Sequence, residues 1–135
     1  MLSGVWQRGF DAAEAASLYS NGPQKGYKLG AALYSSSTLL SIGFNDWYRT
    51  SPWSKHSNWQ GNLHAEIMAL IKRRHYEKSN NLILYISRTK TNSIKTINTP
   101  GCSRPCFNCM TAIKLAGIKK IRFFDEKENP VEIKI

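Results

Sequence analysis

Four residues of this chain have the types and spacing of a metal site with a proton carrier beside it. His64 and Glu66 are separated by one residue, and Cys106 and Cys109 form a C-x-x-C pair further along the chain. Zinc favours thiolate and imidazole ligands, and a catalytic zinc keeps three protein ligands and one position open for water. We therefore predict His64, Cys106 and Cys109 as the ligands. Zinc lowers the pKa of its water, so Glu66 is predicted to move the protons that this water releases.

Each half of the pattern has another interpretation when it stands alone. A C-x-x-C pair also occurs in redox centres and in structural zinc sites, and a single His is more often structural than a ligand. Cys102 is a third cysteine. We interpret it as a loop thiol, although it could replace Cys106 or Cys109 as a ligand. Because both halves precede predicted helices, their combination favours a catalytic zinc site.

The helices that must position these residues are indicated by periodicity and by their ends. Around His64 and Glu66, an apolar stripe with helical spacing is formed by Leu63, Ile67, Leu70 and Ile71. The second helix is expected to begin near Pro105, which suits a first helical position, and to end at Gly117. The other expected elements are a helix over 6–19, strands over 29–34, 39–44, 82–86 and 120–124, a turn at 35–37, and long loops over 45–62 and 89–104.

This order of elements predicts an α/β sandwich with three helices and one mixed sheet of four to five strands. A strand, helix and strand in succession require a parallel crossover. Residues 125–130 are too few for another crossover helix, so residues 131–135 are expected to return as an antiparallel edge strand or to remain a loose tail. With 135 residues, the chain is expected to form one domain over 1–135.

Charge and composition indicate which binding partners and which cellular compartment to expect. The net charge is +10, and the segment from Lys78 to Arg122 holds nine basic residues and no acidic one. A basic face attracts phosphate backbones, although it would also attract an anionic mononucleotide, and a solvated basic surface is the simpler alternative. No apolar run is long enough to span a membrane, and no secretory signal is recognised. The cysteine content favours a reducing, cytoplasmic compartment.

The loop before His64 combines aromatic and cationic side chains. Trp47, Trp53 and Trp59 occur there together with Arg49 and Lys55. Aromatic rings interleaved with cations suit stacking on unpaired bases along a charged strand. We predict that Trp47 and Trp53 contact substrate; the alternative is that they cover the sheet or fill a subunit interface.

The chain resembles the cytidine deaminase-like superfamily over nearly its full length. The similar segments are Leu29–Leu33, Ile42–Asn45, His64–Glu66, Leu84–Tyr85, Pro105–Cys109 and Ala116–Ile121. The resemblance implies the three-layer fold of that superfamily and water attack on cytosine C4 or adenine C6. It also implies that Asn45 and the backbone N–H of Ala65 contact the base or sugar. An ordinary turn residue is the alternative for Asn45.

The subfamily is harder to assign, because different segments resemble different members. Ser103 and Arg104 are similar to a polar pair in polynucleotide cytosine deaminases, so Arg104 is expected to contact substrate. The segment His64–Leu70 is similar to bacterial tRNA adenosine deaminases. The expected antiparallel ending is similar to free cytidine deaminases and some bacterial DNA deaminases. Asp46 follows Asn45 where deoxycytidylate deaminases have a glycine-rich turn, which argues against that subfamily.

Our leading hypothesis is a zinc-dependent hydrolytic deaminase that converts cytosine to uracil in single-stranded nucleic acid, with DNA placed before RNA. The first alternative is a deaminase of free cytidine, deoxycytidine or dCMP, for which the partner is a pyrimidine nucleotide. A tRNA adenosine deaminase is a further alternative. A zinc-stabilised nucleic-acid-binding module without catalysis is the last, and Glu66 argues against it because metal binding alone does not require this carboxylate.

Overall fold

The computed structural model describes residues 4–20, 27–46, 64–72, 81–91, 98–101, 103–105 and 107–135. Within these ranges, the helices are α1 (Gly4–Ser17), α2 (Ala65–Lys72) and α3 (Phe107–Leu115). The strands are β1 (Tyr27–Ser35), β2 (Thr38–Phe44), β3 (Leu82–Thr91), β4 (Asn98–Gly101), β5 (Lys120–Phe124) and β6 (Pro130–Lys134). The predicted α/β class, with three helices around one mixed sheet, is confirmed.

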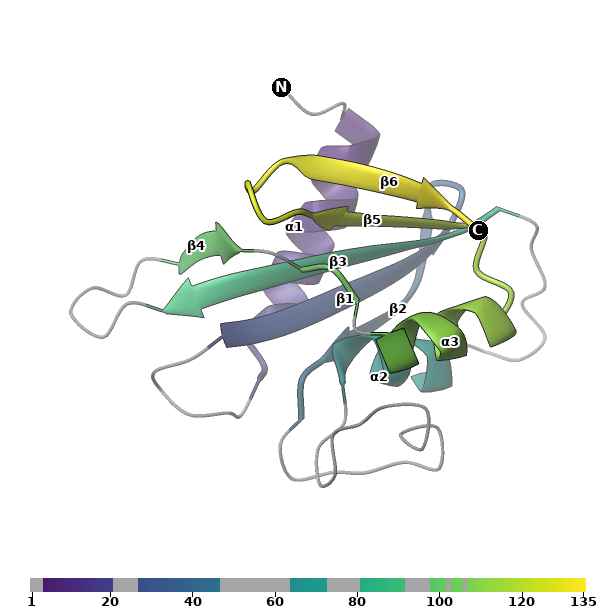
Figure 1. Cartoon of the computed structure of the whole chain (residues 1–135), viewed down its shortest axis with the longest axis horizontal. Coiled ribbons are helices and arrows are strands. Elements are labelled where there is room, and N and C mark those ends of the chain that lie inside the picture. The colour runs from purple at the N-terminus through teal and green to yellow at the C-terminus, as the bar shows by residue number, and fades with distance from the viewer. Residues whose placement is uncertain are drawn as a thin grey trace.

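Five of these strands lie in the order β2-β1-β3-β5-β6 across the sheet (Figure 1). β1 is antiparallel to β2 and β3, β3 is parallel to β5, and β5 is antiparallel to β6. The parallel crossover through α3 and the antiparallel return of the chain end are therefore both as predicted. β6 forms an edge of the sheet, so the chain end is a strand and not a loose tail.

β4 is the element that the sequence prediction missed. β3 continues to Thr91, and β4 pairs antiparallel with its last part, from Arg88 opposite Gly101 to Thr91 opposite Asn98. The predicted loop over 89–104 was wrong at these positions. Pro100 and Gly101 give this segment the composition of a turn, whereas its pairing is set by the edge of β3 that extends beyond β5, a tertiary effect.

The two faces of the sheet are covered by different helices, which gives the three layers. Alternate residues of β3 point to opposite faces: Leu84 packs in the cluster that contains α2 and α3, and Tyr85 packs in the cluster that contains α1. Both faces of β3 are thus buried, as its continuous apolar run predicts. In Figure 1, α1 lies behind the sheet, and α2 and α3 lie together on the other side.

Positive φ angles mark turns of the chain at Ser36, Gly117 and Glu128. Ser36, with φ of 55°, lies in the two-residue turn between β1 and β2. Gly117, with φ of 82°, follows α3, and the backbone bonds from Gly117 to Lys114 and from Ile118 to Ile113 close a Schellman motif. The predicted stop of this helix at Gly117 is confirmed. Among the described residues, no helix is both long and apolar enough to cross a membrane.

Candidate metal centre

His64 and Glu66 lie at the start of α2, in positions set by the first helical hydrogen bond. The carbonyl of His64 accepts this bond from the N–H of Met68, at 3.0 Å, which makes His64 the N-cap residue. Glu66 follows in the first turn, where the positive end of the helix favours a carboxylate. Both side chains are buried, with exposed fractions of 8% for His64 and 4% for Glu66.

Close packing of α2 on β2 holds this helix start against the sheet. A Cβ atom at Gly43 would lie 2.2 Å from the carbonyl oxygen of Ala65 and 2.6 Å from the nitrogen of Ala69. Only glycine permits this approach, because both neighbours are backbone atoms. The Ser41 hydroxyl donates to the carbonyl of Ala69 at 2.7 Å and ties the same helix to β2.

Cys109 reaches the same place from α3. Its side chain is fully buried in a small cluster with Ile67, Met68 and Ala112. This cluster lies between α2 and α3, and the small side chains of Cys109 and Ala112 let the two helices approach. The thiol therefore faces α2 near its N-terminal end.

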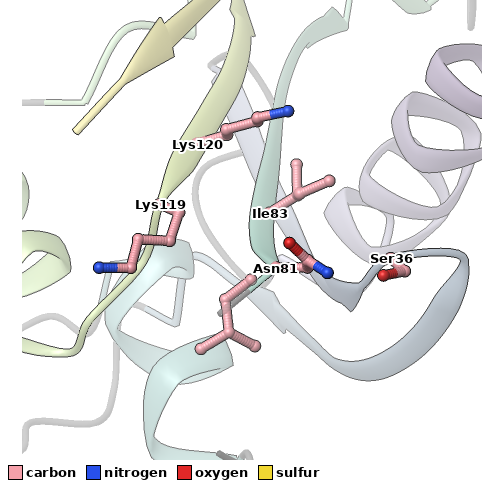
Figure 2. Close-up of a pocket in the computed structure, with 6 residues that line it drawn as sticks. Ser36, Asn81, Ile83, Lys119 and Lys120 are labelled. Carbon is pink, nitrogen blue, oxygen red and sulfur yellow. The ribbon is translucent and has the colours of Figure 1, made fainter. Parts of the chain in front are cut away.

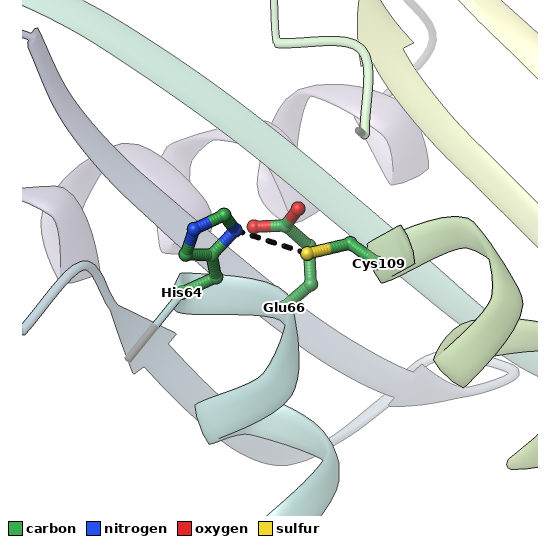
Figure 3. Close-up of side chains that lie close together, drawn as sticks. All are labelled: His64, Glu66 and Cys109. Carbon is green, nitrogen blue, oxygen red and sulfur yellow. Dashed lines mark hydrogen bonds between the residues drawn. The ribbon is translucent and has the colours of Figure 1, made fainter. Parts of the chain in front are cut away.

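The three side chains converge, as Figure 3 shows. One ligand atom from each of His64, Glu66 and Cys109 lies within 4.8 Å of the others. Nδ1 of His64 is 3.0 Å from Sγ of Cys109. Ligand atoms on a tetrahedral zinc are about 3.5 Å apart, given bond lengths of about 2.0–2.3 Å. The donor types and their spacing therefore fit zinc, with Nδ1 as the imidazole atom that faces the thiol.

The remaining predicted ligand, Cys106, lies outside the described residues, as does Cys102. The described cluster alone supplies one imidazole, one thiolate and one carboxylate. A third ligand that comes from the segment before α3 would leave the carboxylate of Glu66 beside the metal as a proton carrier. Trp47 and Trp53, predicted to contact substrate, also lie outside the described residues.

Asn45 and Ala65, both predicted to contact substrate, are buried. Asn45 follows β2 and is buried; its N–H donates to the carbonyl of Leu29 at 3.1 Å, and its carbonyl accepts from the hydroxyl of Ser20 at 2.8 Å. These bonds fix its backbone at the end of β2. Ala65 is fully buried between His64 and Glu66. The expected contacts of both residues with substrate stay predictions.

Arg104 lies on the same side of the sheet, in contact with the turn between β5 and β6. Its Nε donates to Oε1 of Glu126 at 3.2 Å, and its guanidinium lies 4.9 Å from the ring centroid of Phe123. The backbone N–H of Glu126 and, after it, the Arg104 guanidinium lower the pKa of the Glu126 carboxyl, although both side chains are exposed. This ion pair holds Arg104 at the turn between β5 and β6. The expected contact of Arg104 with substrate stays a prediction.

The acidic chain end lies beside the basic segment and neutralises part of it. Arg122 of β5 is paired with Glu132 of β6, with 2.9 Å between Nη2 and Oε1. Arg122 also donates a short hydrogen bond to the hydroxyl of Tyr85 and lies 4.5 Å from the ring centroid of Trp6. It is buried on the α1 side. Two of the nine basic residues, Arg104 and Arg122, therefore do not offer an unpaired charge to a ligand.

Sequence reasoning did not identify a surface formed by Tyr19, Phe44 and Lys72, which we call the aromatic patch. Tyr19, after α1, has an exposed fraction of 68%, and its ring centroid is 5.9 Å from that of Phe44. The Lys72 amino group lies 5.5 Å from the Phe44 ring centroid. Phe44 packs against the cluster that contains Cys109. The three residues come from different elements, so no local sequence pattern could have indicated the patch.

A cavity of about 200 Å³ opens at the other end of the sheet, away from the metal centre (Figure 2). It is lined by Ser36, Asn81, Leu82, Ile83, Lys119 and Lys120. In Figure 2, the amino groups of Lys119 and Lys120 point away from each other. The cavity therefore lacks converging charges, and the metal centre is the stronger candidate for chemistry.

The fold and this centre together define a class of zinc-dependent hydrolytic enzymes. The family model described as "Cytidine and deoxycytidylate deaminase zinc-binding region" matches residues 6–125. The chain belongs to this family, and it is a zinc-dependent deaminase. A comparison with curated proteins gave no match.

Solved structures share the fold over nearly the whole chain. A cytidine deaminase from Burkholderia pseudomallei has a TM-score of 0.66 and 16% identity, covering 98% of this chain and 93% of that one. An apo dCMP deaminase from the cyanophage S-TIM5 has a TM-score of 0.60 and 24% identity, covering 95% and 88%. The same phage enzyme in complex with dCMP and dUMP has a TM-score of 0.58 and 25% identity, covering 90% and 81%. These similarities confirm the cytidine deaminase-like fold.

Proposed function

We propose that this chain hydrolyses the exocyclic amino group of cytosine, and that its substrate is a cytosine in single-stranded nucleic acid, with DNA as the first candidate. The observation that carries the chemistry is the buried convergence of His64, Glu66 and Cys109 within 4.8 Å. A buried imidazole, thiol and carboxylate suit a catalytic zinc better than a structural one, for which four closed ligands are usual.

His64 and Cys109, joined by Cys106, would hold the metal. Zinc, when bound, would make a water molecule acidic enough to act as a nucleophile near neutral pH. The start of α3 favours the ionised form of the cysteine ligands, because its positive end stabilises a thiolate. We propose that the N–H of Ala65 and the side chain of Asn45 orient the base.

Glu66 would carry the protons of the reaction. Its carboxylate takes a proton from the attacking water and delivers it to N3 of cytosine while oxygen adds to C4. It then takes the remaining proton of the oxygen that has added to C4 and transfers it to the amino group, so that the C4–N4 bond breaks, the C4 carbonyl forms and ammonia leaves. The balance is cytosine plus water to uracil plus ammonia. A positioned acid–base group of this kind contributes about 10²–10⁴ to the rate.

The aromatic patch supports a polynucleotide substrate. It places an exposed aromatic ring and a cation beside the cluster that holds Cys109. Stacking of one base on an aromatic side chain contributes about 1–3 kcal/mol and tolerates any base. A cation beside the stacked ring suits the phosphate between successive nucleotides, and the net charge of +10 adds a general attraction.

Deamination of free cytidine, deoxycytidine or dCMP is the second candidate. It is favoured by the pairing of Arg104 with Glu126 and of Arg122 with Glu132, which reduces the positive field available to a long phosphate backbone. A small nucleotide needs only one phosphate contact. A tRNA adenosine deaminase has less support, since it rests on the similarity of the segment His64–Leu70 alone.

A substrate panel tests the proposal. Purified protein would be given a single-stranded oligodeoxynucleotide, the matching RNA, deoxycytidine, dCMP and a tRNA anticodon hairpin, with uracil and inosine as the readouts. We expect uracil from the oligodeoxynucleotide, with binding that weakens steeply as salt increases. Conversion of the small molecules alone would show that the second candidate is right.

A paired variant tests the role of the aromatic patch. Combining Tyr19→Ala with Lys72→Ala should weaken oligonucleotide binding at least about tenfold, the value of one lost stack, while deamination of deoxycytidine changes little. The matched control combines Lys114→Ala with Leu115→Ala at the far end of α3, where both side chains are exposed. Equal weakening in the control would mean that only net charge and exposed apolar surface matter, and not the patch.

A further inference from the structure

Ser103 is a buried residue that lies where β3 and β5 separate. The parallel pairing of these strands runs from Ile83 opposite Lys120 to Tyr85 opposite Arg122. Beyond this point, Ser103 takes the place of the next backbone pairing. Its exposed fraction is 2%, although it belongs to the segment that leads to α3.

Three hydrogen bonds hold Ser103 between the strands. Its hydroxyl donates to the carbonyl of Ile86 in β3 at 2.8 Å and accepts from the N–H of Phe124 in β5 at 2.8 Å. Its own N–H donates to the carbonyl of Phe124 at 2.8 Å. A serine hydroxyl has one donor and can accept as well. This side chain therefore supplies a hydrogen-bond partner to a buried carbonyl of β3 and to an N–H of β5. We call these three bonds the Ser103 clasp.

The clasp acts on the segment that carries the cysteine pair. α3, which carries Cys109, begins four residues after Ser103, and a chain extends at most about 3.6 Å per residue, so Ser103 and the first residue of α3 are at most about 14 Å apart. Pro105, between them, is buried and has a restricted φ. Fixing Ser103 to both strands therefore limits where the start of α3, and with it Cys109, can lie relative to His64.

We infer that Ser103 is a positioning residue for the zinc centre: the clasp sets the approach of the cysteine segment to α2, and its loss loosens the metal. This inference rests on the proposed ligand role of Cys106 and Cys109. Outer groups that orient metal ligands commonly change metal affinity by about 10–100-fold. The clasp would act through the backbone of residues 103–105, since its three hydrogen bonds go to Ile86 in β3 and Phe124 in β5.

The test compares Ser103→Ala with Ser103→Thr, which keeps the hydroxyl. Zinc release to a chromophoric chelator would be followed at a temperature at which circular dichroism shows each variant folded. Ser103→Ala should release zinc about tenfold faster than the unchanged protein, and Ser103→Thr should remain within about twofold of it, a margin small beside the 10–100-fold effect. In the Co²⁺-substituted protein, the alanine variant should also shift the d–d absorption bands, which report the ligand geometry.

Ser17→Ala is the matched control. Ser17 is a fully buried serine of α1, on the other side of the sheet, whose hydroxyl donates to the carbonyl of Glu14 at 2.6 Å. Its loss should lower thermal stability without changing zinc release or the Co²⁺ spectrum. Zinc release from Ser103→Ala at the rate of the unchanged protein, or equal acceleration in Ser17→Ala, would overturn the inference.

A measurement on the unchanged protein keeps the inference testable if Ser103→Ala does not fold. Because coupling between two sites is reciprocal, removal of zinc should speed hydrogen exchange at the N–H groups of Ser103 and Phe124. Exchange in the core of α1 should change less. Equal exchange at Ser103 and Phe124 with and without zinc would overturn the inference, whether or not the protein deaminates cytosine.

Discussion

The two faces of the sheet are built from the same strands, yet they bury different kinds of side chains. The α1 face holds aromatic rings, such as Phe10 edge-on to Tyr85 at 5.5 Å, and the buried pair of Arg122 with Glu132. The α2 and α3 face holds mainly aliphatic and small side chains, including Ala65 and Ala69, together with the ring of Phe123. Several aromatic rings fill the space between α1 and the sheet. On the other face, small residues let α2 and α3 approach, and the buried side chains of His64, Glu66 and Cys109 lie close together. We infer that one face mainly stabilises the fold and the other carries the chemistry.

The largest expected effect is the loss of the thiol on the α2 and α3 face. Cys109→Ala should remove most of the zinc and lower kcat/KM by at least about a thousandfold, because water without the metal is far too weak an acid to supply a nucleophile near neutral pH. Metal analysis measures the zinc content, and the rate of uracil formation measures kcat/KM. The matched control is Cys102→Ala, which should keep zinc and activity; loss of zinc in this variant would instead make Cys102 a ligand.

Two glycines offer a direct comparison of the faces. At Gly30, a Cβ would lie 1.9 Å from the carbonyl oxygen of Ala13 in α1, and at Gly43 it would lie 2.2 Å from that of Ala65 in α2. Changing either to alanine should lower the free energy of unfolding by about 2–3 kcal/mol, the cost of overpacking.

Only Gly43→Ala should also weaken zinc binding, by about tenfold, since it moves the start of α2, where the ligand His64 is the N-cap residue. Denaturant unfolding and zinc titration separate the two effects. If Gly30→Ala weakened zinc binding as much, the division of roles between the faces would be wrong.

The buried ion pair on the α1 face should affect stability alone. Glu132→Gln leaves the guanidinium of Arg122 buried, with an exposed fraction of 9%, and without its counter-charge. We expect the free energy of unfolding to fall by about 2 kcal/mol. This is less than the cost of about 3–5 kcal/mol for breaking a fully buried pair, because Glu132 is partly exposed. Thermal unfolding measures this loss, and kcat/KM for deoxycytidine should stay unchanged; a clear fall in kcat/KM would link this pair to the chemistry.

The smallest effect is expected at the end of α3. Gly117→Ala places a Cβ on a residue with φ of 82°, which costs about 1 kcal/mol. The position lies at the opposite end of α3 from its first turn, so zinc content should stay the same. Gly117→Asn, which tolerates this conformation better, is the control and should lose less stability.

Much of the fold was predictable, because local patterns and tertiary packing agree in most elements. The apolar run at the start of β3 and the Gly117 stop of α3 both lie where the sequence places them. β4 was not predictable, since Asn98–Gly101 has the composition of a turn and pairs only because β3 offers a free edge.

The candidate site was predictable to the same degree. The types and spacing of His64, Glu66 and Cys109 indicate a metal centre, and the structure brings their ligand atoms together. The Ser103 clasp and the aromatic patch were not predictable, because their partners are distant in sequence and only the fold brings them together. Trp47 and Trp53, which we expect to contact the substrate, lie outside the described residues, so their role stays a prediction.

The most direct test of the account compares the zinc-loaded protein with its Glu66→Gln variant. Uracil and ammonia would be measured in parallel from a single-stranded oligodeoxynucleotide and from deoxycytidine, with metal content determined on the same samples. We predict equal amounts of uracil and ammonia from the unchanged protein. The variant should keep its zinc, with kcat lower by about 10²–10⁴. A zinc-loaded Glu66→Gln protein with unchanged kcat, or an unchanged protein that yields no uracil from either substrate, would contradict the account.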